Sequence, residues 1–365
     1  MYLFRMTLYI FIKHLKYIFQ KVLQEVDNIK ITILVDNITD RLLPSSPVVE
    51  RFPMISNQKF NKPPIAEHGF SALLQISYIY KNQRLINKFL FDTGVSENGV
   101  IYNSDIFGIN FGDIETIVLS HGHFDHFSGL VSVLKRINKP TKIIMHPDAL
   151  LKRWIVFPNG NKAKMDTLNE ETISDFNGII IKRSGVNYLP YENKIMNNNE
   201  KDYEDNNNQY NNGNRRILIT GEIPRITPFE KGFPLQYKEA TDESNLLIPD
   251  PLVKDDQALV MNLKNKGLVI LSGCGHAGII NTIKYATKVT GINNIFAVIG
   301  GFHLTGEGYE KAISLTINEL KTIDPKYIIP CHCTGWKASN EIIKEMPHKY
   351  IQTSVGSTFA FNSLS

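Results

Sequence analysis

The chain has 365 residues, of which 42% are hydrophobic and 21% are charged, as is typical of a globular protein of one or two domains. The formal net charge is only +4, and no dense run of Lys and Arg accompanies it, which argues against a nucleic-acid-binding protein. The three cysteines are too few, and odd in number, for a disulfide framework, which favours a cytoplasmic location.

The first 28 residues are predicted to form an amphipathic helix or extension that precedes the main fold. Leu8, Phe11 and Leu15 fall at helical spacing, with lysines between them. The uncharged run at residues 6–12 is far shorter than the roughly 20 residues that span a bilayer, so no transmembrane span is expected. Two interpretations stay open, a helix packed on the body or on a second subunit, and a helix lying on a membrane surface.

Residues 29–365 alternate short apolar runs with helical patterns. The run at about 193–214 is rich in asparagine and charge, and we expect it to be a disordered insert within one domain. Hairpins are mixed with strand–helix alternation, which suggests an α/β fold with αββα layers, two mixed sheets flanked by helices. That layer order also depends on the family resemblance described below. The predicted strands cover residues 31–35, 71–78, 86–91, 114–120, 142–146, 178–183, 217–221, 257–263, 268–273, 295–301 and 327–330.

Candidate metal ligands are concentrated in one short run, where His121, His123, Asp125 and His126 follow a predicted strand. Imidazole and carboxylate together suit zinc, manganese or iron. Four ligands on so tight a turn do not easily converge on one ion, so we expect them to be shared between two neighbouring ions. The small Gly122 allows the backbone to fold this tightly. The alternative, a chance polar loop, fits this spacing poorly.

Other histidines at strand ends are candidates for completing two coordination shells. His276 and His332 follow predicted strands on short turns, as His121 does, and we expect both to be ligands. His303 also ends a predicted strand and is a candidate for contacting the substrate or a metal ligand. His68, close to the start of a predicted strand, is a candidate for the same role.

Cysteines and one aspartate accompany these histidines. Cys274 is either a thiolate ligand or, the interpretation we favour, a small buried residue at a tight turn. Cys331 and Cys333 flank His332, and strand alternation predicts that they point away from it. Asp92 stands in an Asp-Thr-Gly run, but an aspartic protease of this length needs two such runs and the chain has one. We therefore expect Asp92 to hydrogen-bond a ligand histidine and fix its tautomer.

The His-x-His-x-Asp-His motif, the Asp-Thr-Gly run and the later strand-end histidines together resemble the metallo-β-lactamase superfamily. The resemblance runs from about Lys30 to the C-terminus, without the Asn-rich insert. It implies an αββα sandwich with a two-metal site at one edge. By this resemblance the ligands of metal one would be His121, His123 and a later histidine, and those of metal two Asp125, His126 and His332.

The chain departs from that pattern at two places. The family's third ligand of metal one lies in a Gly-His turn before the hairpin, and residues 249–256 contain no histidine. The bridging aspartate after the hairpin is replaced by Cys274. The role of the third histidine is therefore carried over to His276.

A narrower likeness links the chain to one subgroup of this superfamily. The subgroup includes archaeal enzymes described as dihydropteroate-synthase-like, which join a dihydropterin methyl diphosphate to a ribofuranosyl-aminobenzene phosphate in methanopterin biosynthesis. Other members are known only as metal-dependent hydrolases. The runs that carry the likeness are Val35-Asp36-Asn37, Glu67-His68-Gly69-Phe70-Ser71, Asp255-Asp256-Gln257-Ala258-Leu259, Gly273-Cys274-Gly275-His276-Ala277-Gly278 and Gly300-Gly301-Phe302-His303-Leu304.

The resemblance leaves three functions open: a transferase of that kind, a hydrolase of a small ester or phosphoester, and a metal-binding regulatory module without catalysis. It implies two divalent ions, with zinc favoured, manganese or iron as alternatives, and magnesium if the substrate is a diphosphate. The expected partner is a small molecule, such as a pterin diphosphate or another phosphorylated compound. Self-association into a homo-oligomer stays open.

Overall fold

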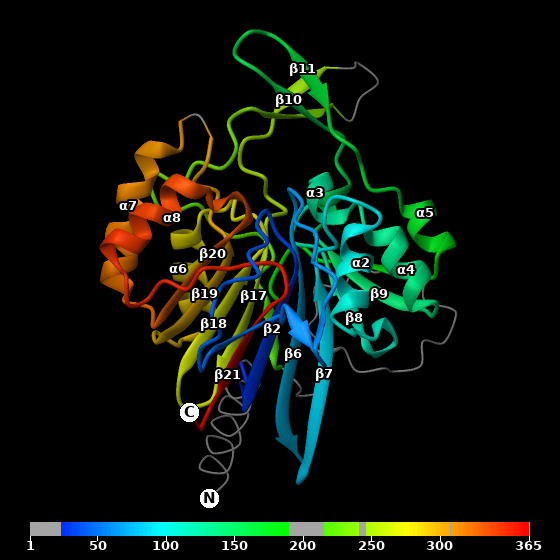
Figure 1. Ribbon diagram of the computed structural model, residues 1–365. Helices are drawn as coiled ribbons and strands as arrows, with labels where there is room; N and C mark the ends of the chain where they lie inside the picture. Colours follow the sequence, from blue (N-terminus) through cyan, green and yellow to red (C-terminus); the bar gives the residue numbers. More distant parts are fainter. Residues whose placement is uncertain (1–22, 190–214, 241–245, 307, 365) are drawn as a thin grey trace, which may run out of the picture.

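The computed structural model describes residues 23–189, 215–240, 246–306 and 308–364 (Figure 1). The helix expected near the N-terminus and the Asn-rich insert at 193–214 lie outside the described residues. Among the helices in these ranges, none combines the length and the apolar character that a membrane span requires.

One sheet has eight strands, parallel from β12 to β7 and antiparallel beyond. Its central strands are long, and in β2 buried and more exposed positions largely alternate, as expected for a sheet with one face in the core. In spatial order the strands are β12 (Gly178–Lys182), β9 (Thr141–Met145), β8 (Thr116–Val118), β7 (Gln83–Phe91), β6 (Ser71–Tyr80), β2 (Asn28–Val35), β21 (Ser357–Asn362) and β3 (Val49–Arg51).

The second sheet has seven strands, and the predicted hairpin around residues 264–266 joins two of them, β17 and β18. Strand β1 (Glu25–Val26) pairs in parallel with β17, and Leu23 before it is buried. Residues 23–28, expected to be part of the N-terminal extension, therefore belong to the sandwich. The other strands, in spatial order, are β13 (Asn187–Leu189), β14 (Ile217–Ile219), β17 (Ala258–Leu263), β18 (Gly267–Ser272), β19 (Ile295–Gly301) and β20 (Tyr327–Cys331).

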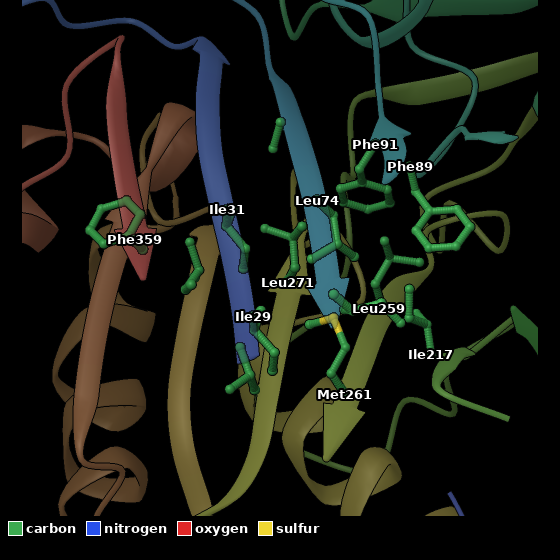
Figure 2. Packing of buried hydrophobic residues seen from close by; sticks show 14 of the residues in the cluster. Ile29, Ile31, Leu74, Phe89, Phe91, Ile217, Leu259, Met261, Leu271 and Phe359 are labelled. Carbon is green, nitrogen blue, oxygen red and sulfur yellow. The ribbon is translucent and has the colours of Figure 1, made fainter. Parts of the chain in front are cut away.

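The main core lies between the two sheets, where Ile29, Ile31 and Leu74 of one sheet face Leu259 and Leu271 of the other (Figure 2). Helices cover the outer faces, each over its own buried cluster (Figure 1). This arrangement confirms the αββα layers. The helices on the second sheet are α6 (Ile279–Thr290), α7 (Glu310–Ile323) and α8 (Trp336–Glu345), and those on the first are α2 (Gly99–Ile106), α4 (Leu130–Ile137) and α5 (Glu170–Asp175).

A small antiparallel sheet lies above one edge of the sandwich, where Figure 1 shows β10 and β11 over α3 (Phe124–Phe127). We call it the accessory sheet. The sequence analysis did not predict it, because its strands are only three or four residues long, too short to show a clear alternation. Its strands, in spatial order, are β11 (Lys162–Lys164), β10 (Arg153–Val156), β15 (Gln236–Glu239) and β16 (Leu247–Pro249). The remaining strands, β4 (Ile55–Ser56) and β5 (Lys59–Phe60), form an isolated hairpin.

Candidate metal centre

The histidine motif lies on the loop that follows β8 at the edge of the sandwich. His121 and His126 are fully buried, and α3 begins directly after His123. Gly122 is sterically required, because a Cβ atom at this position would lie 2.1 Å from the carbonyl oxygen of Ala149. The backbone therefore turns tightly at Gly122, and the side chains of His121 and His123 on either side of it can face the same site from different directions.

A first donor group consists of His121, His123 and His276, whose ligand atoms all lie within 4.8 Å of one another. His276 follows β18, and its Nε2 lies 3.1 Å from Nδ1 of His123. Three nitrogens at such distances match three of the four ligand positions of a tetrahedral zinc site. The structure thus brings His276 to the two motif histidines with which the sequence grouped it.

A second donor group consists of Asp125, His126 and His332. Asp125 Oδ2 lies 3.3 Å from Nε2 of His332 and 3.8 Å from Nε2 of His126. His332 follows β20 with a φ of +47°, a conformation unusual for a residue other than glycine. The two groups are adjacent, since the ring centroids of His121 and His126 are 4.2 Å apart.

Four of these histidines have a buried ring nitrogen without a hydrogen-bond partner among the described residues. These atoms are Nε2 of His121, of His126 and of His332, and Nδ1 of His276. Leaving a buried polar atom unpaired costs about 1–3 kcal/mol, so such atoms in a folded protein call for an explanation. A divalent ion in each donor group would give them a partner, and the residues present therefore fit two metal ions.

Asp92 orients two of the histidines, His126 directly and His121 through Ser120. It is fully buried and accepts hydrogen bonds from the backbone nitrogen and the Oγ of Ser120, both at 2.6 Å. Its Oδ2 also lies 2.7 Å from Nδ1 of His126. Since Ser120 Oγ donates to Asp92, it accepts from Nδ1 of His121 at 2.9 Å. Both histidines therefore carry the proton on Nδ1 and present Nε2 as the free ligand atom.

The loop after β2 holds His332. Asp36 accepts from the backbone nitrogen of His332 at 2.8 Å, and Asn37 Oδ1 lies 3.2 Å from Nδ1 of the ring. His68 lies at the rim, with 68% of its side chain exposed and its Nε2 4.0 Å from Oδ2 of Asp125. This placement leaves His68 free to contact a ligand that approaches the second donor group.

The accessory sheet contributes a contact that the sequence analysis missed. Gln236 Oε1, at the start of β15, lies 2.5 Å from Nε2 of His123. Gln236 is fixed in turn, since its side-chain nitrogen donates to the carbonyl oxygen of Asp250 at 3.1 Å and to its Oδ2 at 3.0 Å. With Nε2 engaged, His123 presents Nδ1 to the first donor group.

A buried ion pair links the same sheet to the motif loop. Arg153, 1% exposed at the start of β10, donates to both carboxylate oxygens of Asp255, at 2.5 and 3.1 Å. Asp255 Oδ2 also accepts from the backbone nitrogen of Gly122 at 2.7 Å. Asp255 is thus engaged by the protein itself and fixes the loop between His121 and His123.

Burial and neighbouring charges set the ionisation of the ligands. Burial lowers the pKa of His121 and of His276 well below the usual range and that of His123 to about 4. These imidazoles are therefore neutral at pH 7, as ligation requires. Burial opposes the charged form of His126 too, but the carboxylates of Asp125 and Asp92 raise its pKa to about 9. A metal ion held by the second donor group would therefore have to displace a proton from His126.

Comparison with known proteins agrees with this geometry. The family model described as the metallo-β-lactamase superfamily matches residues 87–194, which include the motif. A Methanocaldococcus jannaschii protein, 7,8-dihydropterin-6-methyl-4-(β-D-ribofuranosyl)-aminobenzene-5′-phosphate synthase, is 30% identical over 308 residues, 83% of this chain and 92% of that protein. The chain belongs to the metallo-β-lactamase superfamily.

One further relative is similar in sequence, and one solved structure is similar in fold. An uncharacterized protein of the same archaeon is 31% identical over 277 residues, 76% of this chain and 88% of that protein. The crystal structure of a metal-dependent hydrolase of the β-lactamase superfamily superposes with a TM-score of 0.64 at 18% identity, covering 92% of this chain and 99% of that one. At this identity the superposition supports the metallo-β-lactamase fold and no particular reaction.

This member of the superfamily has two thiols beside its donor groups. Cys274 is buried, lies within ligand distance of His121 and His126, and has its Sγ 3.0 Å from that of Cys333. The expectation that Cys333 points away from the site is wrong, because β20 ends at Cys331 and a 3₁₀ turn follows, so strand alternation no longer applies. Cys274 is thus both a buried residue and a donor within reach of the centre.

His303 lies beside the first donor group rather than in it. Its ring centroid is 4.1 Å from that of His276, and its Nδ1 is 3.4 Å from Sγ of Cys274. Its Nε2 is buried without a partner among the described residues. His303 also lines a cavity of about 390 Å³ that opens next to His276. This is where a substrate would meet the candidate metals of this metallo-β-lactamase fold.

Proposed function

We propose that the protein is a dinuclear metalloenzyme. In this proposal His121, His123 and His276 hold one divalent ion, while Asp125, His126 and His332 hold the other. The observation that carries it is that each of these two groups contains buried Nε2 atoms without a hydrogen-bond partner among the described residues, those of His121, His126 and His332. The imidazole-rich donors and the adjacent thiol of Cys274 favour zinc, with manganese and iron as alternatives.

We infer further that its reaction is a transfer. The supporting observation is the 30% identity over 92% of a relative that is named as a synthase. The product in that name contains a dihydropterin-methyl group and a ribofuranosyl-aminobenzene phosphate. The substrates would be a dihydropterin methyl diphosphate and the ribofuranosyl-aminobenzene phosphate. The amine nitrogen forms a bond to the methylene carbon, the carbon–oxygen bond breaks, and diphosphate leaves with the bonding electrons while the nitrogen loses a proton.

The protein's own residues provide position and a dry site for this reaction. When bound, two divalent ions would supply positive charge against the diphosphate oxygens. His303 has an unpartnered Nε2 at the cavity and is our candidate for a polar contact to the reacting amine. Correct placement of two reactants can contribute roughly 7–11 kcal/mol to lowering a barrier. Exclusion of water protects the activated methylene carbon from hydrolysis.

We also propose that the enzyme acts in the cytoplasm, since its three cysteines are all free thiols. Its partners, in this proposal, are its small phosphorylated substrates.

The test is diphosphate release by the purified protein, loaded with zinc, manganese or magnesium, with and without the arylamine phosphate. The proposal requires release that depends on the arylamine and that His121→Ala abolishes. Release without the arylamine would identify a hydrolase. A protein that binds metal but turns over neither these substrates nor small phosphoesters would be a binding module.

A further inference from the structure

The cavity beside His276 is formed mainly by three segments from distant parts of the chain: residues 229–235, the turn after β18, and residues 302–306 with 308, 309 and 312; Pro158 completes the described lining. Its volume of about 390 Å³ lies within the range of small-molecule sites. Its lining includes His276 of the first donor group, so a molecule in the cavity would lie next to the proposed metals. The lining also includes the loop that carries Lys231.

The walls next to the metal centre are aromatic. The Phe233 ring stacks on His276 at 5.8 Å between centroids and meets His303 edge-on at 5.6 Å. Tyr309 also meets His303 edge-on, with ring centroids 4.6 Å apart. Such walls favour a flat ring, which can stack or make edge contacts without losing hydrogen bonds.

The cavity contains a carboxylate, but that carboxylate is already engaged. Glu230 accepts from the backbone nitrogens of Ile280 and Asn281, both at 2.8 Å, and from Oγ1 of Thr227 at 2.9 Å. It therefore caps helix α6. A pterin ring has an edge of amino and ring N–H groups that needs an acceptor for both, and Glu230, which already accepts three hydrogen bonds out of about four, cannot accept from both. The cap also closes the N-terminus of α6 to a phosphate.

Lys231 is the cationic side chain in the described lining, and it is exposed at the rim. An exposed cation beside apolar, aromatic walls fits a ligand that combines an aromatic ring with an anion. Of the two proposed substrates, the ribofuranosyl-aminobenzene phosphate has this form.

We propose that this cavity binds the arylamine acceptor, with its benzene ring against the aromatic wall that Phe233 and Tyr309 form, its phosphate at Lys231 and its amine next to His276. The inference rests on the proposed transferase function and specifies which substrate occupies which part of the site. The dihydropterin diphosphate would then approach from the side of the second donor group, where His68 is exposed.

The cavity is held in shape without a ligand. Tyr309 Oη donates to the carbonyl oxygen of Gly232 at 2.8 Å and so joins two of the three segments. Gly232 has a φ of +77°, and a Cβ atom there would lie 2.0 Å from the carbonyl oxygen of Pro251. The loop that carries Lys231 and Phe233 is thus fixed by glycine geometry, which lowers the entropy cost of binding.

The test is calorimetric titration of the metal-loaded protein with ribofuranosyl-aminobenzene phosphate and with its phosphate-free analogue, in the absence of the diphosphate substrate. We expect Lys231→Ala to weaken binding of the phosphate compound about tenfold, the effect of one lost charge-assisted contact, and to leave the analogue unchanged. Phe233→Ala should weaken both compounds by at least about tenfold. Phe233→Leu, which keeps apolar volume, checks that any loss is not due to misfolding.

Matched controls are Lys337→Ala on α8 and Phe60→Ala on β5, exposed residues outside the cavity lining. Unchanged affinity in both cavity variants, or no binding of either compound to the wild type, would overturn the inference. Binding without turnover would reject the transferase function but keep the cavity assignment. Turnover with an unaltered KM for the arylamine in both variants would support the transferase function but reject the cavity assignment.

Discussion

Asp92 Oδ2 lies 2.7 Å from Nδ1 of His126, and neither side chain is exposed to solvent. This contact joins the end of β7 to the motif loop and leaves Nε2 of His126 as the free ligand atom. Carboxylate–histidine pairs of this kind raise the basicity of a ligand and fix its ring. We expect Asp92→Asn to weaken metal binding by about 10–100-fold without removing it. Competition with a chelating dye measures this, and unchanged affinity would show that the pair has only a structural role.

Gln236 should act in a similar way on the other donor group, because it hydrogen-bonds Nε2 of His123. Gln236→Leu removes the acceptor at nearly constant volume, and we expect a loss of metal affinity of about 10–100-fold. Tyr237→Phe, at the next position of the same strand, is the matched control and should bind as wild type. Equal affinities in the Gln236 variant and the control would reject a positioning role.

The ion pair of Arg153 and Asp255 gives a prediction about stability. Arg153→Met would leave the carboxylate of Asp255 fully buried without its cation. Such a loss typically lowers the free energy of unfolding by about 3–5 kcal/mol. Urea unfolding of the metal-free protein measures this cost. Adding Asp255→Asn to the variant should recover part of the loss, since an amide oxygen can still accept from Gly122. A single variant as stable as wild type would contradict this account.

Asp256 gives the protein a pH-dependent stability. Burial raises the pKa of this carboxyl group to about 7, so the folded protein retains a proton that the unfolded chain releases near pH 4, roughly. Stability is therefore expected to fall as pH rises between these values, with a slope that approaches about 1.4 kcal/mol per pH unit. Asp256→Asn should flatten that slope. Denaturant unfolding at several pH values compares the two proteins, and parallel profiles would contradict the assignment.

The sequence was most informative about the candidate site where candidate metal ligands are close together along the chain. His121, His123, Asp125 and His126 lie within six residues, and their spacing alone indicates a metal site. Strand ends are also readable, because apolar runs mark them, and this led to His276 and His332. The sandwich itself followed from the same apolar runs and from the family resemblance.

Contacts that depend on folding over long distances were not predictable. Gln236 meets His123 across 113 positions, and Arg153 meets Asp255 across 102. Both arise from the accessory sheet, whose strands of three or four residues are too short to carry a periodic apolar signal. Cys333 was misplaced for a local reason, since the strand alternation used to orient it ends two residues earlier, at Cys331.

The most direct test of the central claim is metal content per chain, by elemental analysis of protein purified without a chelator. Wild type and His121→Ala are compared, with circular dichroism to confirm that both are folded. Two donor groups predict about two equivalents of divalent metal in the wild type and a clear loss in the variant. Absence of metal from the wild type, or full retention by the folded variant, would contradict the dinuclear site.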